Sequence, residues 1–193
     1  MRRFMVSVCL IVFAFVCIGC SSTLQWENKA DAPNPSPELK KLEGLVGDWA
    51  YEGEQADPPV AGLPYGGAGK YFGTSTHRFV LDGFFMEEKI EDNNPSGRTS
   101  IFTLTGYDPK SGKYTQSSFI SDGSSSVATA TLDGATWTSN STMTTSEGKQ
   151  VLLRTVVKYS SDWASVTATT EASPDNGKTW KLWYKDEGRK VKK

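Results

Sequence analysis

Residues 77–90 have the sequence HRFVLDGFFMEEKI, the longest apolar-rich extended segment after the N-terminus. It contains His77, the only histidine of the chain, and a central glycine, Gly83. Apolar and charged side chains alternate at its far end, which is typical of a strand with one buried face. We expect one long bent strand that lines a β-barrel, with its bend at Leu81–Phe85. Because a glycine bend resets which face points inward, the sequence does not establish that His77 and Glu88 share a wall.

Other extended segments occur at regular intervals and are joined by turn sequences such as Asp133-Gly134 and Asp175-Asn176-Gly177. Almost no helical pattern separates them, which favours an all-β, antiparallel up-and-down barrel of about ten strands over βαβ units. The other expected strands are Gly47–Gly53, Lys70–Thr76, Thr99–Tyr107, Lys113–Ser121, Ser126–Leu132, Ala135–Ser139, Gln150–Ser160, Trp163–Glu171 and Thr179–Lys185.

A short helix is expected before the first strand. Ser36-Pro37-Glu38 combines an N-cap residue, a proline at the first helical position and an acid in the first turn. Leu39, Leu42 and Leu45 then recur on one face, so we expect an amphipathic helix that covers one open end of the barrel. Residues 55–69 are rich in Pro and Gly and predict a long loop, which could gate the mouth of the barrel.

The N-terminus has the pattern of an export signal. A basic start, Met1-Arg2-Arg3, precedes an apolar run over 4–18 that is too short to span a bilayer comfortably. The ending Ile18-Gly19-Cys20 resembles a bacterial lipobox, although such sequences usually have no cysteine at the place of Cys17. The resemblance implies a lipid on Cys20 and an outer-membrane address facing the periplasm; secretion is the alternative.

These patterns divide the chain into four parts: a signal peptide (1–19), a proline-rich flexible tether (20–36), the barrel domain (37–187) and a basic disordered tail (188–193). No cysteine follows Cys20, so the mature domain has no disulfide, thiolate nucleophile or cysteine metal site. With 21 Lys+Arg against 22 Asp+Glu, the chain has no basic excess for nucleic acid. We expect the membrane, through the lipid, to be one partner.

Motifs for catalysis are incomplete. Residues 66–71, GGAGKY, lack the leading glycine and the Ser or Thr of a phosphate loop. Ser75 and His77 would share a strand face, but no oxyanion hole or orienting acid is evident, and we predict no catalytic residue, metal site or cofactor. Residues 173–180, SPDNGKTW, resemble the Asp-box of sialidases, a structural hairpin in which Asp175 caps backbone amides and Trp180 packs inward.

Five side chains are candidates for contact with a ligand. His77 is one, either as a structural wall residue or as a ligand contact. Glu87 and Glu88 point to opposite faces, and we select Glu88 as the inward acid, with Arg154 as a candidate partner that could also fix an anionic or polar ligand. Aromatic residues on alternating strands add Trp49 and Tyr107.

Four motifs together resemble the bacterial family known as domain of unknown function 1579. They are LEGLVGDW (42–49), LDGFFME (81–87), GYDPKSGKY (106–114) and EASPDNGKTW (171–180). Their order and spacing extend over residues 39–185. The resemblance implies a lipocalin-like barrel of roughly ten strands and no established activity. Gly47-x-Trp49 also resembles the start of nitrobindin-type haem barrels, but those use a histidine near the C-terminus, and none follows His77.

The leading functional hypothesis is a lipid-anchored barrel whose interior binds a small hydrophobic or amphipathic molecule. The first alternative is an enzyme or haem protein that uses His77, Arg154 and an inward glutamate. The second is an envelope scaffold with a filled barrel, in which no cavity is larger than a water or two.

Overall fold

A computed structural model of the chain describes residues 34–191. No helix in this part of the chain is long and apolar enough to cross a membrane. The elements are α1 (Pro37–Lys40), the 3-10 turn η1 (Glu43–Leu45), β1 (Gly47–Gln55), β2 (Gly69–Val80), the 3-10 turn η2 (Leu81–Gly83), β3 (Phe85–Asn94), β4 (Gly97–Asp108), β5 (Lys113–Ile120), β6 (Ser125–Asp133), β7 (Thr136–Thr144), β8 (Gln150–Tyr159), β9 (Ser165–Ser173) and β10 (Lys181–Lys190).

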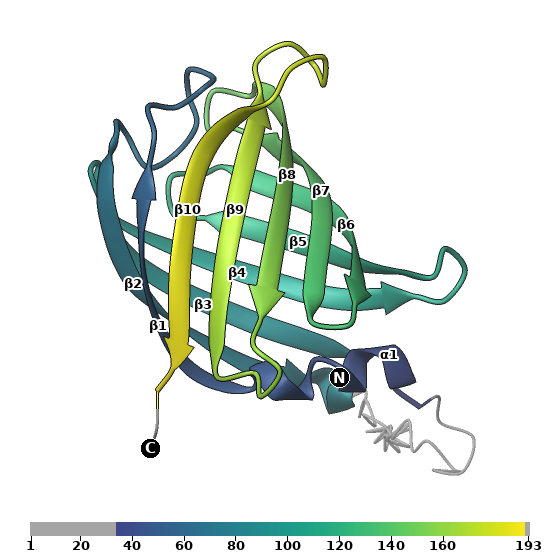
Figure 1. Ribbon diagram of the computed structural model, residues 1–193. Helices are drawn as coiled ribbons and strands as arrows, with labels where there is room; N and C mark the ends of the chain where they lie inside the picture. Colours follow the sequence, from purple (N-terminus) through teal and green to yellow (C-terminus); the bar gives the residue numbers. More distant parts are fainter. Residues whose placement is uncertain (1–33, 192–193) are drawn as a thin grey trace, which may run out of the picture. The chain divides into compact units, whose positions relative to one another are not determined.

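The strands form one closed antiparallel barrel (Figure 1). Each strand pairs with its neighbours in sequence, and β10 closes the ring against β1 through pairs that run from Trp49–Lys190 to Gln55–Tyr184. Closure removes the exposed sheet edges that would otherwise template aggregation. The predicted all-β class and up-and-down topology are confirmed.

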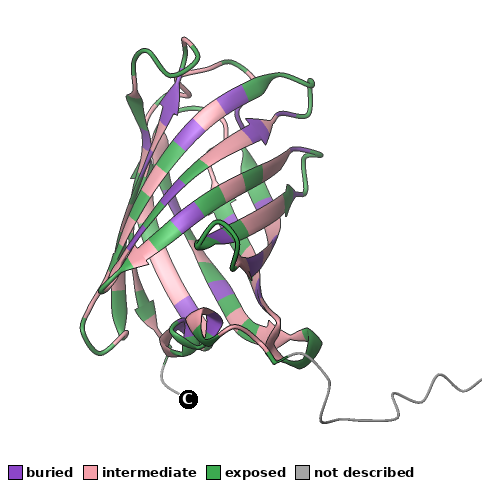
Figure 2. Ribbon diagram, turned by 90° about the vertical axis from the view of Figure 1, so that its right-hand side faces the viewer, coloured by how far each residue is buried: buried purple, intermediate pink, exposed green. Residues whose placement is uncertain are grey.

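Burial changes from residue to residue along most strands, as Figure 2 shows. In β7, for example, Trp137 and Ser139 are buried whereas Thr138 and Asn140 are exposed. This period of two follows from the pleat, which sends successive side chains to opposite faces of the sheet. One face therefore lines the barrel interior and the other contacts solvent.

Residues 77–90 form a hairpin, which corrects the expectation of one bent strand. β2 ends and β3 begins on either side of the turn Leu81–Gly83, whose φ angles are 51°, 57° and 87°. Glycine and, less often, aspartate adopt this left-handed conformation, so Asp82-Gly83 is a turn sequence like those at other hairpins, but the apolar residues on both sides of it made the segment look like one strand. The hairpin places His77 directly opposite Glu88.

The predicted N-terminal helix is present but brief. The Ser36 hydroxyl accepts a hydrogen bond from the Glu38 amide, as expected of an N-cap, and the helix gives way to a 3-10 turn after one turn. Leu39 of the helix and the two leucines that follow it are buried in a cluster at this end of the barrel, which consists of Leu39, Leu42, Leu45, Trp49, Met86, Tyr114, Ala130 and Trp137. The helix thus covers the end of the barrel, as predicted.

The loop between β1 and β2 lies at the opposite end of the barrel from α1 (Figure 1), and its Leu63 belongs to a second apolar cluster. The Gln55 side-chain amide donates hydrogen bonds to the carbonyl oxygens of Tyr65 (2.7 Å) and Gly67 (2.6 Å), which holds the loop across β1. The buried members of this cluster are Leu63, Ile120, Met143, Val151, Leu153, Ala172 and Trp183. The gating of this end by the loop stays a prediction.

The C-terminal boundary differs from the sequence-based one. We expected a disordered tail from residue 188, but β10 continues to Lys190, with Arg189 opposite Ala50 and Lys190 opposite Trp49. β1 needs these partners for its own backbone hydrogen bonds, so closure of the barrel extends the strand into the basic segment. The predicted signal peptide and most of the tether lie outside the described residues.

Candidate functional site

The barrel encloses a cavity of about 330 Å³. Every strand contributes to its wall, together with Leu42 and Leu45 at one end and Tyr65 of the β1–β2 loop. Both apolar clusters supply lining side chains, among them Trp137 and Trp183. Serine, threonine, tyrosine and acidic side chains complete the lining, so the cavity offers apolar surface and hydrogen-bonding groups together.

One side of the cavity is acidic. Glu88 and Asp92 face it from β3, and Asp186 faces it from β10. Within residues 34–191, no lysine or arginine lines the cavity, and His77 is the one lining side chain there that can become a cation. Carboxylates removed from water are costly unless they are paired with a positive charge. This wall is therefore an electrostatic feature that packing alone does not require.

Pairs of tyrosine and glycine shape the wall between these acids. Tyr51 on β1 lies opposite Gly73 on β2, and Gly53 lies opposite Tyr71. A Cβ atom on Gly73 would be 2.4 Å from the Tyr51 hydroxyl oxygen, and one on Gly53 would be 2.8 Å from Cζ of Tyr71. Each ring therefore lies across the backbone of the facing glycine, as aromatic residues do when they cover glycines in sheets. This arrangement keeps both rings close to the wall.

Asp186 is held by one of these tyrosines. The Tyr71 hydroxyl donates a 2.7 Å hydrogen bond to Oδ2 of Asp186. Burial, together with the negative charge of Glu88, outweighs this hydrogen bond and raises the pKa of Asp186 to about 6. A carboxyl with this pKa can exchange a proton near neutral pH.

Tyr51 lies within the field of all three carboxylates. Burial raises the pKa of Tyr51, and the negative charges of Asp92, Glu88 and Asp186 each add to the increase. Asp92 is itself buried, which raises the pKa of its carboxyl although Asn94 donates a hydrogen bond to it at 2.8 Å. The Tyr51 hydroxyl is buried and has no hydrogen-bond partner.

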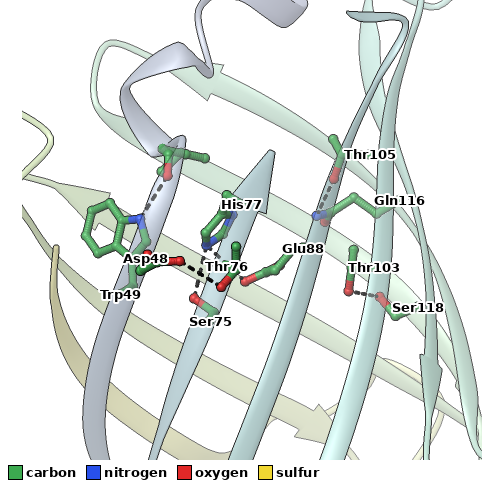
Figure 3. Close-up of polar contacts among 11 residues, drawn as sticks. Asp48, Trp49, Ser75, Thr76, His77, Glu88, Thr103, Thr105, Gln116 and Ser118 are labelled. Atoms are coloured by element: carbon green, nitrogen blue, oxygen red, sulfur yellow. Dashed lines mark hydrogen bonds and ion pairs between the residues drawn. The ribbon is translucent and has the colours of Figure 1, made fainter. Parts of the chain in front are cut away.

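His77 lies between a hydroxyl and a carboxylate (Figure 3). Its Nε2 atom is 3.1 Å from Oγ of Ser75 and 3.4 Å from Oε1 of Glu88. A catalytic relay requires the nucleophile and the orienting acid on opposite ring nitrogens. Here both contacts involve Nε2, so the cluster lacks the geometry of a Ser–His–acid triad and instead presents a polar patch to the cavity.

The neighbouring wall carries hydroxyl and amide groups. Thr103 and Ser118 share a 2.9 Å hydrogen bond across β4 and β5, and the Gln116 amide donates to Thr105 at 3.2 Å (Figure 3). All four side chains line the cavity. Hydroxyls both donate and accept, so this wall can adapt to a neutral polar group on a bound molecule.

Arg154 is not in the site, which corrects its predicted pairing with the inward glutamate. It lies on the outer face of β8, where its guanidinium bonds to Glu171 and is 4.7 Å from the ring centroid of Trp180. Trp180 is therefore also outside the barrel, although the Asp-box resemblance predicted inward packing. The predicted turn is present, because the Asp175 carboxylate accepts hydrogen bonds from the amide and hydroxyl of Thr179, both at 2.7 Å.

The two predicted aromatic residues have different positions. Trp49 lines the cavity, and its indole donates a 2.8 Å hydrogen bond to the Leu45 carbonyl oxygen. Tyr107 is partly buried beside Tyr114, with ring centroids 5.2 Å apart, in the cluster next to α1, and does not contribute to the cavity wall. Among the predicted residues, the structure thus brings His77, Glu88 and Trp49 together.

Sequence patterns did not reveal four other cavity residues. Tyr51, Tyr71 and Asp92 become recognisable only when the β1–β2–β3 register is known, since that register pairs the tyrosines with glycines and places Asp92 opposite Gly73. Asp186 follows a register shift between Leu182 and Tyr184, which breaks the alternation along β10. A Tyr-x-Gly signal in β1 matched by Tyr-x-Gly in β2 could have indicated the paired rings.

Comparisons with known proteins extend these observations. A family model described as "Protein of unknown function (DUF1579)" matches residues 34–183 and agrees with the resemblance seen in the four motifs. The crystal structure of Rv2717c from M. tuberculosis is similar with a TM-score of 0.61 and 14% sequence identity, over 82% of this chain and 100% of that one. At this identity the likeness concerns the fold alone. No curated protein matches the sequence.

Proposed function

The chain belongs to the DUF1579 family, and because that family has no assigned activity, we propose from the barrel interior that it is a binding module for a small amphipathic molecule. The ligand would lie inside the barrel, with its apolar part against Trp49, Met86 and Trp137 and its polar part against the acids and hydroxyls. The observation that carries the proposal is the cavity of about 330 Å³ with this mixed lining.

The size of the cavity favours a ligand over a filled scaffold. One water molecule requires roughly 15 Å³ of cavity volume, whereas the volumes of binding sites for small molecules begin near about 300 Å³. The wall also includes several small side chains, Ala128 and Ala168 among them, and these leave the centre of the barrel open. A scaffold stabilised by burial alone would gain from larger residues at these positions.

Two residues of the wall carry a buried polar atom that has no hydrogen-bond partner. Among the described residues, the Tyr51 hydroxyl and the Trp183 indole nitrogen are the two buried side-chain polar atoms without a hydrogen-bond partner. Both residues line the cavity. A buried donor without a partner costs about 1–3 kcal/mol, so such atoms usually have a reason to be there. Both atoms are out of reach of water in the cavity, so a ligand could bond to them only after a local movement of the wall.

Native mass spectrometry of protein purified from its own host tests this proposal. The wild type should carry a bound small molecule. Ala168→Phe places a large ring in the cavity and should abolish the extra mass, whereas Thr169→Phe places the same ring on the outer face and should retain it. Wild-type protein without any bound molecule, and with a thermal stability that Ala168→Phe does not lower, would contradict the proposal.

We also propose that the domain acts at the cell envelope, held by a lipid on Cys20. The support is the basic start, the short apolar run and the Gly19-Cys20 ending of residues 1–20, all in the sequence outside the described residues. A tether between Cys20 and Ser36 would let the barrel collect its ligand close to a membrane surface.

A further inference from the structure

We infer that the cavity selects a positively charged organic amine whose apolar body fits between the aromatic side chains, an inference that rests on the proposed function and specifies its ligand. Three carboxylates, Glu88, Asp92 and Asp186, line one cavity. No lysine or arginine among the described residues faces them from any strand. A ligand cation would supply the positive charge that this wall lacks.

The partners of the three acids do not neutralise them. Asp186 accepts from the Tyr71 hydroxyl at 2.7 Å and Asp92 from the Asn94 amide at 2.8 Å, and both donors are uncharged. Oε1 of Glu88 is 3.4 Å from Nε2 of His77, and this contact includes a positive charge only when the imidazole is protonated. By contrast, Glu87 and Glu91 on the outer face of β3 bind the guanidinium groups of arginines. On β3, the two outer glutamates are thus paired with arginines, whereas the two inner acids have no lysine or arginine beside them.

An extended organic cation fits this arrangement better than a compact metal ion. No group of three or more potential metal-ligating side chains converges within residues 34–191. Glu88 and Asp92 are four residues apart on one strand, which separates their backbones by roughly 13 Å at about 3.3 Å per residue. An amine can place its nitrogen beside one carboxylate while the negative potential of the others strengthens the attraction.

Aromatic side chains complete a site for such a molecule. Trp49, Tyr51 and Tyr71 lie on the same part of the wall as the acids, and an aromatic face attracts an ammonium group as well as an apolar body. Carboxylate ligands such as fatty acids would instead be repelled by this wall.

Matched probes distinguish these chemistries. In one set, 2-phenylethylamine, 2-phenylethanol and 3-phenylpropionate share a body and differ in head group; tryptamine, tryptophol and indole-3-propionate form a second set. Binding is measured by calorimetry at pH 7.5. The amines should bind at least about tenfold more tightly than the alcohols, as expected for a charge-assisted hydrogen bond, and the acids should not bind.

Charge-neutral variants test the assignment of the wall. Glu88→Gln and Asp186→Asn should each weaken amine binding about tenfold and leave alcohol binding within about twofold. Glu91→Gln removes the same charge from the outer face of β3 and should change neither. Alcohols that bind as tightly as amines, or acids that bind best, would overturn the cation inference and leave the proposed function standing.

The molecule that co-purifies with the protein gives a second readout. A basic nitrogen in its structure would support the inference, and a neutral or acidic molecule would overturn it while still supporting a binding role. If no molecule co-purifies and none of the six probes binds, both the cation inference and the proposed function fail.

Discussion

Replacing Asp186 by asparagine should make the protein more stable at neutral and alkaline pH. The asparagine amide has nearly the same shape, and its oxygen can still accept the hydrogen bond from Tyr71. It removes a negative charge that is buried in the barrel and lies near Glu88. The variant should be more stable than the wild type only at pH values where the wild-type carboxyl is ionised. The pH dependence of this stability difference therefore identifies the ionised carboxyl as its cause.

The magnitude follows from the pKa of Asp186, which rises from 3.8 to about 6 on folding because of burial. The folded protein therefore binds the proton more tightly than the unfolded chain, and the stability contributed by Asp186 is fully present below pH 4 and is lost as the pH rises through about 6. At about 1.4 kcal/mol for each tenfold change in proton affinity, the loss is at most about 3 kcal/mol. Because this carboxyl retains some contact with water, we expect about 1–3 kcal/mol.

Urea unfolding at pH 4, 5, 6, 7 and 8, followed by tryptophan fluorescence, measures this effect. The free energies of unfolding of Asp186→Asn and wild type should be similar at pH 4 and should separate, with the variant more stable, between pH 4 and 7. Glu187→Gln removes a charge from the next, exposed residue of β10 and controls for net charge. Curves that run parallel for Asp186→Asn and wild type would refute the argument that this carboxyl is held in a cavity poor in water.

Three further predictions concern the cover of the barrel, its wall and its anchor. Leu42→Ala should lower the free energy of unfolding by about 2–5 kcal/mol because Leu42 is 1% exposed, whereas Leu81→Ala, at 66% exposed, should change it by less than about 0.5 kcal/mol. Gly73→Ala should lower the free energy of unfolding by about 1–3 kcal/mol in the same urea assay, because its new methyl group would lie 2.4 Å from the Tyr51 hydroxyl and 2.5 Å from the Glu91 carbonyl oxygen. An unchanged free energy would show that the Tyr51 ring does not cover this glycine. Cys20→Ser should move the protein from the membrane fraction to the soluble fraction in cell fractionation, and an unchanged distribution would contradict lipid anchoring.

The barrel could be predicted from sequence because its turns carry strong local signals. Asp133-Gly134 and Asp175-Asn176-Gly177 join strands close to the expected positions, with left-handed φ at Gly134, Asn176 and Gly177. The turn Leu81–Gly83 also contains an Asp-Gly pair, but we interpreted it as a bend within one strand. Its first residue is a leucine, and apolar residues on both sides made the segment look continuous.

The direction of side chains in the site was predicted only where alternation is clear. Glu88 points inward as expected, since Met86 and Ile90 mark the inner face of β3. In β8 apolar residues occupy both faces, because Leu152 packs outside and Leu153 inside, so the pattern gave no reliable direction for Arg154. The acidic wall combines β3 with β10 through the register of β1 and β2. Because β10 is far from these three strands in sequence, no local pattern contains this arrangement.

The central claim is that the barrel interior holds a ligand beside its acidic wall. A crystal structure of the protein purified from its own host, without added ligand, tests this claim most directly. We predict continuous density for an organic molecule in the cavity, with its polar end within hydrogen-bonding distance of Glu88 or Asp186 and its apolar body against Trp49 or Trp137. A cavity that contains only ordered water, or one filled by rearranged side chains, would contradict the claim.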